Sequence, residues 1–300
     1  MTELELQHLR REKWRLEGEP LRTSEDAREF VDSVGLCLMF PVRPMPLLPT
    51  FVAATIGSDQ KLPTRKTAFS DERVRDSQGL LMRLIRDKSA FEGQLQGETL
   101  VLSPQVFPYY YTLASDRMPK QPLRSRERGK GSPLSEHVFC MLDESGPLTR
   151  AQLQQQLGGA LSEAGLDRAL QELWAALKIT RIDHDAGRGD TWATYYHWAP
   201  DLVNEGVRMS DAQALSGLIS KYLDGVIAAT EEEIENVLSP IASRARVAEV
   251  VRAMLGAREF TYTPSETRTL ITVQSPVSPA AARAEREATT RNFAPRRRNG

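Results

Sequence analysis

Residues 149–174 read TRAQLQQQLGGALSEAGLDRALQELW, and this stretch decides the predicted fold. Thr149 and Ser162 each stand before a run with apolar residues at helical spacing, a typical position for a helix N-cap. Gly158 and Gly159 separate the two runs, and glycine just after the last apolar residue commonly ends a helix. The stretch therefore predicts two consecutive helices joined by a short turn.

The sequence on either side of this stretch completes a familiar order. An apolar face over residues 134–144 predicts a preceding helix, which ends before Pro147. Two runs rich in β-forming residues follow, at 179–182 and 191–198, and a polar turn containing glycine joins them. Three helices followed by a β-hairpin is the order of a winged helix. We therefore expect residues 134–203 to form one winged-helix domain.

The same pattern returns later in the chain. Thr230 and Ser243 stand at the same offset from Thr149 and Ser162, and the apolar positions after them keep register. Thr230 and Glu233 have the spacing of a capping box. Agreement of caps and apolar positions together indicates one supersecondary unit used twice. Residues 204–274 are thus predicted to form a second winged-helix domain.

Residues 24–115 are predicted to hold a third, looser copy. Ser24 is expected to cap a helix that runs through Val34, a second helix is expected around 70–86, and Gly97 lies in a hairpin turn. Prolines interrupt residues 40–51, so any helix there is short. The fold class expected is α+β, mainly α, with tandem winged helix-turn-helix domains.

Three further segments lie outside these domains. Residues 1–23 are predicted to form an N-terminal helix. Residues 116–133 lack apolar periodicity and are rich in Pro, Gly, Lys and Arg, which is typical of a basic linker. Residues 275–300 are predicted to be a disordered basic tail, because they contain too few apolar residues to pack a core.

Composition limits the classes of function. The 300 residues include 39 Lys plus Arg and 40 Asp plus Glu, a formal net charge of -1, which excludes a wholly basic DNA-coating protein. No apolar run is long enough to span a bilayer, and no secretory signal begins the chain, so no membrane association is expected. The two cysteines, Cys37 and Cys140, cannot build a disulfide framework, which favours a cytoplasmic location.

Motifs for metal, nucleotide and hydrolase chemistry are missing from the sequence. It contains no CxxC or HExxH spacing, and neither GxGxxG nor GxxxxGK[ST]. We therefore expect no metal site and no cofactor. Asp183-His184-Asp185 lies beside the predicted turn of a wing, where a solvated turn is the better interpretation.

Basic clusters point to double-stranded DNA as the partner, since a near-neutral chain with segregated charge can still present a positive face. In a winged helix the third helix enters the major groove and the wing contacts the backbone. The predicted DNA-binding residues of these helices, wings and the linker are Arg168, Lys178, Arg181, Arg188, Arg244, Arg246, Arg252, Arg258, Arg268, Arg124, Arg126, Arg128 and Lys130. The third helix of the second copy carries fewer acidic residues, so it is the better candidate for contacting phosphate.

The element order, with GPLTRAQL at 146–153 and LDRALQEL at 166–173, resembles the AlkZ/YcaQ-type winged-helix proteins. In that family three tandem winged helices form a DNA-binding body, and members excise alkylated or crosslinked bases. The resemblance thus implies a role in DNA repair. The family's enzymes carry Gln-aliphatic-Gln or Gln-x-Asp shortly after the first helix, whereas residues 36–40 here contain neither Gln nor Asp. Gln94 and Gln96 match the pattern locally, which makes them weak catalytic candidates within a predicted wing.

Three hypotheses of function remain open at this point. The first is a DNA-binding protein of stacked winged helices related to DNA repair. The second is a DNA glycosylase that excises alkylated or crosslinked bases. The third is a scaffold that binds a protein partner, which the acidic residues within 163–172 favour.

Overall fold

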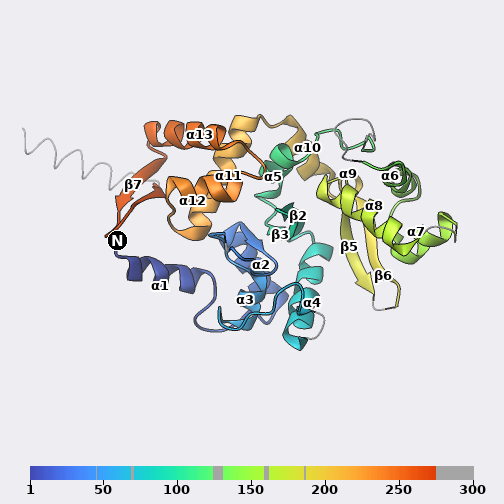
Figure 1. Cartoon of the computed structure of the whole chain (residues 1–300), viewed down its shortest axis with the longest axis horizontal. Coiled ribbons are helices and arrows are strands. Elements are labelled where there is room, and N and C mark those ends of the chain that lie inside the picture. The colour runs from blue at the N-terminus through green and yellow to red at the C-terminus, as the bar shows by residue number, and fades with distance from the viewer. Residues whose placement is uncertain (45, 69–70, 124–130, 159–161, 186, 275–300) are drawn as a thin grey trace, which may run out of the picture.

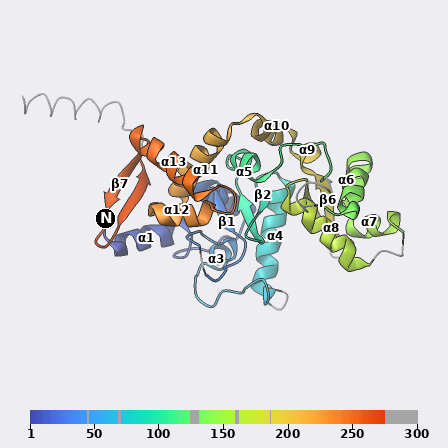
Figure 2. The ribbon, with the colours of Figure 1, turned by 45° about the horizontal axis from the view of Figure 1, so that its top comes forward.

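The structure, a computed structural model, describes residues 1–44, 46–68, 71–123, 131–158, 162–185 and 187–274. Three groups of helices and strands follow one another along the long axis in Figure 1, and Figure 2 shows the same order from a second direction. Residues 24–102 form the central group, with 133–194 at one end and 211–273 at the other. Among the described residues, no helix combines the length and apolar character needed to cross a membrane.

The central group begins with a capped helix and ends with a hairpin. Its elements are α2 (Ser24–Val34), β1 (Leu36–Leu38), α3 (Phe51–Ile56), α4 (Glu72–Arg86), β2 (Phe91–Leu95) and β3 (Glu98–Leu102). The cap of α2 is Thr23 and not Ser24 as predicted, because the capping-box partner is Asp26, three residues after Thr23. Asp71 caps α4 by accepting from the backbone N–H of Arg73. The three strands form an antiparallel sheet in the order β1-β3-β2, which leaves β2 at an edge.

The second group repeats this order of elements. It comprises α6 (Pro133–Ser145), β4 (Leu148–Thr149), α7 (Arg150–Gln156), α8 (Glu163–Ala175), β5 (Ile179–Asp185) and β6 (Gly189–Thr194). Thr149 caps α7 with a capping box and Ser162 caps α8, as the sequence predicted. The sheet order, β4-β6-β5, corresponds to that of the central group. This group buries a core of its own around Phe139, Leu166 and Leu173.

The third group has the same order again. Its elements are α11 (Asp211–Val226), α12 (Glu231–Leu238), α13 (Arg244–Gly256), β7 (Phe260–Pro264) and β8 (Thr269–Val273). Thr230 and Ser243 cap α12 and α13, and the predicted capping box between Thr230 and Glu233 is present. A single antiparallel bridge between Ala229 and Ile271 takes the place of the short first strand.

Four helices connect the groups and cover their ends: α1 (Glu3–Lys13), α5 (Phe107–Ala114), α9 (Tyr195–Trp198) and α10 (Pro200–Arg208). The largest buried cluster includes Phe107 of α5 together with residues of the central and third groups, such as Leu36 and Leu215. The central and third groups therefore share one core. Helix α1 docks on the third group, where Leu6 packs with Ala228.

Two predictions about local structure are wrong. The sequence predicted a strand through residues 191–198, but β6 ends at Thr194 and α9 follows. The reason is the register, since Thr194 pairs with Ile179, the first residue of β5, and residues beyond it have no strand to pair with. The N-terminal helix is also shorter than expected. It was predicted within residues 1–23, but α1 ends at Lys13.

Candidate nucleic-acid interface

Helix α4 presents one buried face and one exposed face. Val74, Leu81 and Ile85 lie on the buried side, against α2 and α3. The exposed stripe repeats at intervals of three or four residues and carries Arg75, Gln78, Gly79, Arg83 and Arg86. This stripe offers a mainly cationic surface between Arg75 and Arg86.

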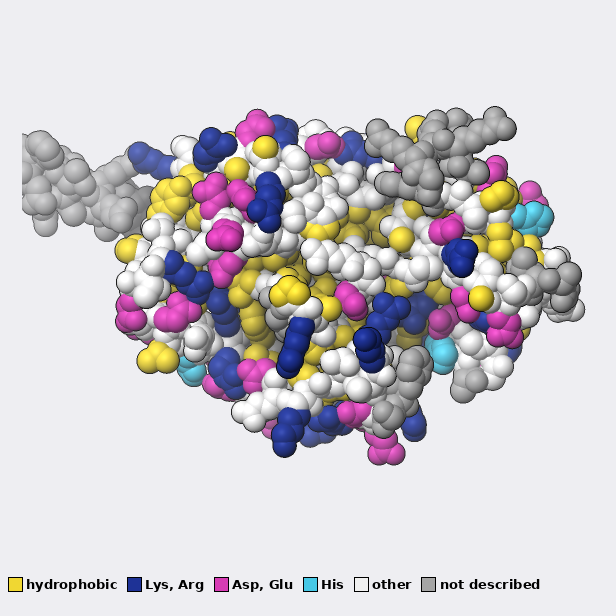
Figure 3. Space-filling model, in the orientation of Figure 1, with side chains coloured by type: hydrophobic (Ala, Val, Ile, Leu, Met, Phe, Trp, Pro, Cys, Tyr) yellow, Lys and Arg dark blue, Asp and Glu magenta, His cyan; other side chains and the backbone are white. Residues whose placement is uncertain are grey.

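This stripe forms one wall of a cleft with a volume of about 1360 Å³. The opposite wall comes from α7, α8, β5 and β6 of the second group. Eight arginines line the cleft against three aspartates. They are Arg22, Arg65, Arg73, Arg75, Arg83, Arg86, Arg150 and Arg181, against Asp76, Asp167 and Asp190. Figure 3 shows Lys and Arg side chains gathered over α3 and α4, at the lower centre of the molecule.

Several of these arginines are neutralised locally. Arg73 contacts Asp71 at 2.6 Å, and Arg150 contacts Asp167 at 2.8 Å between Nε and Oδ1. Arg86 of α4 pairs with Asp183 of β5 across the cleft. In contrast, the side chains of three exposed arginines make no ion pair or hydrogen bond with any residue that the structure describes. These unpaired cations are Arg22, Arg75 and Arg83.

An ion pair with a buried carboxylate holds Arg181, one of the arginines that line the cleft. Glu92 on the edge strand β2 is fully buried, and Arg181 of β5 donates from Nε to Glu92 Oε2 at 3.0 Å. The guanidinium carbon also lies 5.7 Å from the centre of the Trp174 ring. Burial disfavours the charge on Arg181, but attraction and hydrogen bonding by Glu92 and Asp190 together outweigh burial and raise the pKa of Arg181. This ion pair joins the central group to the second.

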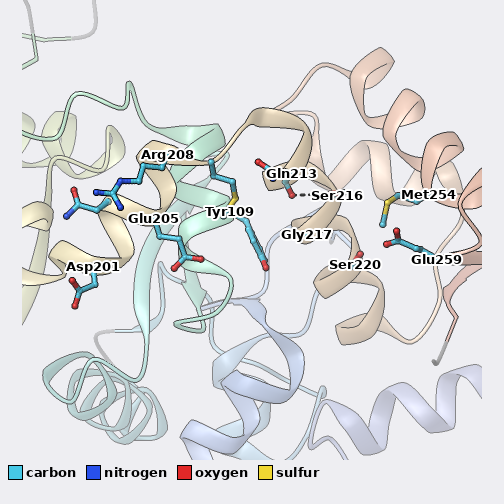
Figure 4. A pocket seen from close by; sticks show the side chains of 12 residues that line it. Tyr109, Asp201, Glu205, Arg208, Gln213, Ser216, Gly217, Ser220, Met254 and Glu259 are labelled. Atoms are coloured by element: carbon cyan, nitrogen blue, oxygen red, sulfur yellow. Dashed lines mark hydrogen bonds between the residues drawn. The ribbon is translucent and has the colours of Figure 1, made fainter. Parts of the chain in front are cut away.

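A second hollow of about 770 Å³ lies between α10 and α11, with Tyr109 of α5 at its base. Figure 4 shows Asp201, Glu205 and Arg208 on one side of it and Glu259 on the other. Three carboxylates against one arginine repel phosphate. The arginine-lined cleft is therefore the better candidate for a nucleic-acid interface.

Most of the DNA-binding residues predicted in the second group lie outside the cleft. Only Arg181 lines the cleft, and its guanidinium is already paired with the Glu92 carboxylate. Arg168 is exposed on α8, and Arg188 is exposed in the turn between β5 and β6. Neither residue lines the cleft.

The prediction of an exposed Lys178 is wrong. Its side chain is only 1% exposed, and Nζ donates to Asp116 Oδ1 at 2.8 Å and to the Met118 carbonyl at 2.7 Å. The cause is that α8 ends at Ala175, so Lys178 precedes the buried start of β5 instead of continuing the helix surface. Burial lowers the pKa of Lys178, and the hydrogen bond to Asp116 only partly offsets this.

The predicted residues of the third group are not in the cleft, and most have partners nearby. Arg244 donates to Asn236 Oδ1 at 2.7 Å, and Arg246 contacts Glu249 at 2.7 Å. Arg268 contacts both Glu3 and Glu233 at 2.8 Å, so its charge is neutralised. Arg252 bonds a backbone carbonyl of its own helix, and Arg258 is exposed. Arg124, Arg126, Arg128 and Lys130 lie outside the described residues.

Sequence reasoning missed most of the cleft arginines. A signal for Arg75, Arg83 and Arg86 was present, because they recur at helical spacing on the polar face of residues 72–86. That Arg150 faces them could not be inferred, since it depends on how the two groups pack.

The residues considered for catalysis do not form a polar site. Gln94 lies on β2, where its backbone N–H donates to the Tyr110 hydroxyl, and Gln96 occupies the hairpin turn; neither lines the cleft. Cys37 and Met39, in the region after the first helix of the central group, are 0% and 3% exposed. Burial raises the pKa of the Cys37 thiol, which is therefore neutral. Within the described residues, no group of three or more His, Cys, Asp or Glu could hold a metal ion.

Comparisons with known proteins agree with this architecture. The family model described as "DNA glycosylase AlkZ-like" matches residues 72–293. Among solved structures, the DNA glycosylase AlkZ of Streptomyces sahachiroi is similar in fold, with a TM-score of 0.56 and 19% identity over 96% of this chain and 72% of that chain. A search of curated proteins found no match. Because the family model covers well over half of the sequence, this chain belongs to the AlkZ-like DNA glycosylase family.

Proposed function

We propose that this protein binds double-stranded DNA through the cleft between α4 and the second group, in a role related to DNA repair. The observation that carries the proposal is the unpaired charge of Arg22, Arg75 and Arg83 in a cleft lined by eight arginines and three aspartates. Phosphate contacts from arginine supply most of the affinity in sequence-independent DNA binding. Membership of the AlkZ-like family supports the same partner.

We interpret each group of elements as a winged helix, so that three such units lie in tandem. The common order of helices and the common sheet order support this interpretation. Under it, α4 is the third helix of the central unit, and the hairpin of β5 and β6 is the wing of the second. The third helix and the wing are the parts that usually contact DNA in this fold.

The acidic residues of α8, which favoured a protein partner, already have partners within the chain. Asp167 and Glu163 both contact Arg150, at 2.8 Å and 3.5 Å. Glu172 accepts hydrogen bonds from the backbone N–H and the hydroxyl of Ser132. These carboxylates make contacts inside the chain, so they are poor evidence for a protein partner. The arginine-lined cleft therefore favours DNA over a protein as the partner.

A binding titration tests the proposal directly. The full-length protein is titrated into a fluorescein-labelled duplex, and anisotropy is read over a range of salt concentrations. We expect a Kd of about 1 µM or below near ~50 mM salt, with log affinity falling linearly with log salt. Contact from the three unpaired arginines alone gives a slope of about -3. A duplex that stays unbound at the lowest salt contradicts the proposal.

We further propose that the protein binds without excising a base. Hydrolytic removal of a base needs a polar side chain that activates or positions water. The region after the first helix of the central group instead offers Cys37 in β1 and Met39 just after it, both buried, and Met39 lines the cleft together with Phe40. We expect no abasic sites after prolonged incubation with alkylated duplex, measured by alkaline strand cleavage on a denaturing gel. A glycosylase active on the same duplex serves as the control, and cleavage above background would overturn the proposal.

A further inference from the structure

Gly79 lies at the middle of α4, where glycine is an unfavourable residue. The helix spans Glu72–Arg86 without interruption, and Gly79 is eighth of its fifteen residues. Glycine in a helix interior destabilises the helix relative to alanine, because the unfolded chain loses more conformational freedom on folding. A structural or functional reason is therefore needed for glycine at this position.

Two other glycines inside helices are explained by packing. A Cβ on Gly217 of α11 would lie 2.8 Å from the Tyr109 ring, and one on Gly206 of α10 would lie 3.0 Å from the side chain of Tyr111. At Gly79 an added Cβ would meet no described atom within 4 Å. Packing inside the protein thus leaves room for a side chain that the sequence does not supply.

The surroundings of Gly79 belong to the cleft. Gly79 lines it together with Arg75 and Arg83, which stand four residues before and after it. At a rise of about 1.5 Å per residue, each guanidinium-bearing residue lies about 6 Å along the helix from Gly79. The bare backbone of α4 is therefore flanked on both sides by unpaired arginines.

We propose that Gly79 is the point of closest approach between α4 and the sugar-phosphate backbone of bound DNA, with Arg75 and Arg83 holding phosphates on either side. This inference rests on the proposed function. It adds that Gly79 sets how closely α4 approaches the bound duplex. A position without a side chain cannot contact a base edge, so recognition at this point depends on the backbone and shape of the duplex.

A matched pair of glycine variants tests the inference. Gly79→Ala fills the open space, and Gly256→Ala makes the same change at the last residue of α13, where an added Cβ also meets no described atom within 4 Å and which lies outside the cleft. We expect Gly79→Ala to leave Tm unchanged or to raise it, and to weaken duplex binding about tenfold by anisotropy. We expect Gly79→Leu to weaken binding further, and Gly256→Ala to bind like the unmodified protein.

Each contrary outcome identifies what fails. If Gly79→Ala and Gly79→Leu both bind as tightly as the unmodified protein, Gly79 is not a contact, and the proposed function still stands. A fall in Tm for Gly79→Ala would show that glycine serves folding, which also overturns the inference. If the unmodified protein itself does not bind duplex DNA, the proposed function fails and the inference fails with it.

Discussion

Arg75 and Arg83 differ from the other arginines of α4 in having no ionic partner among the described residues. Arg73 is held by Asp71, and Arg86 by Asp183 across the cleft. A guanidinium already paired with a carboxylate must give up that contact before it binds phosphate, whereas an unpaired one gives up only water. The two unpaired residues should therefore contribute most to DNA affinity.

Reversing these two charges gives a prediction at the level of the residue. We expect the double variant Arg75→Glu, Arg83→Glu to bind duplex at least about tenfold more weakly at low salt, with a salt slope smaller by about 2. Arg252→Glu on α13 is the control, because Arg252 is exposed and outside the cleft. Anisotropy titrations of the three proteins measure the difference. An equal loss in Arg252→Glu would move the interface to α13, where the sequence alone had placed it.

At the level of the element, the starts of helices could be predicted because they depend on local chemistry. Thr149, Ser162, Thr230 and Ser243 each accept a hydrogen bond from a backbone N–H three residues later, and the helices begin where these caps stand. The hairpin around Gly97 was likewise predictable, because glycine adopts the positive φ of 81° that its turn requires.

The ends of elements and the cleft could not be predicted, because they depend on residues distant in the sequence. Strand β6 stops at Thr194 since its partner begins at Ile179. Arg268 was expected to be available for DNA, but Glu3, at the other end of the chain, approaches it to 2.8 Å. The candidate site itself combines α4 with β5, and no pattern within either segment indicates that they face each other.

At the scale of the whole molecule, the cleft exists because the central and second groups hold a fixed relation. Two ion pairs join them, and each group supplies the arginine of one pair and the carboxylate of the other. Arg86 of the central group pairs with Asp183 of the second, and Arg181 of the second pairs with Glu92 of the central group. The second pair is the stronger constraint, since Glu92 is fully buried while Arg86 and Asp183 are both about half exposed.

Removing the Glu92 carboxylate should therefore weaken the packing of the two groups. We expect Glu92→Ala to lower the free energy of unfolding by about 2 kcal/mol in urea denaturation, because it leaves the partly buried Arg181 charge with only Asp190, at 3.7 Å, as a carboxylate partner. The double variant Glu92→Met, Arg181→Met should recover much of this loss, since it removes both charges and fills the space with apolar groups. Arg188→Ala, which breaks only an exposed pair with Asp185, is the control and should not change stability measurably. A double variant as unstable as Glu92→Ala would show that the position requires a carboxylate for some reason other than balancing Arg181.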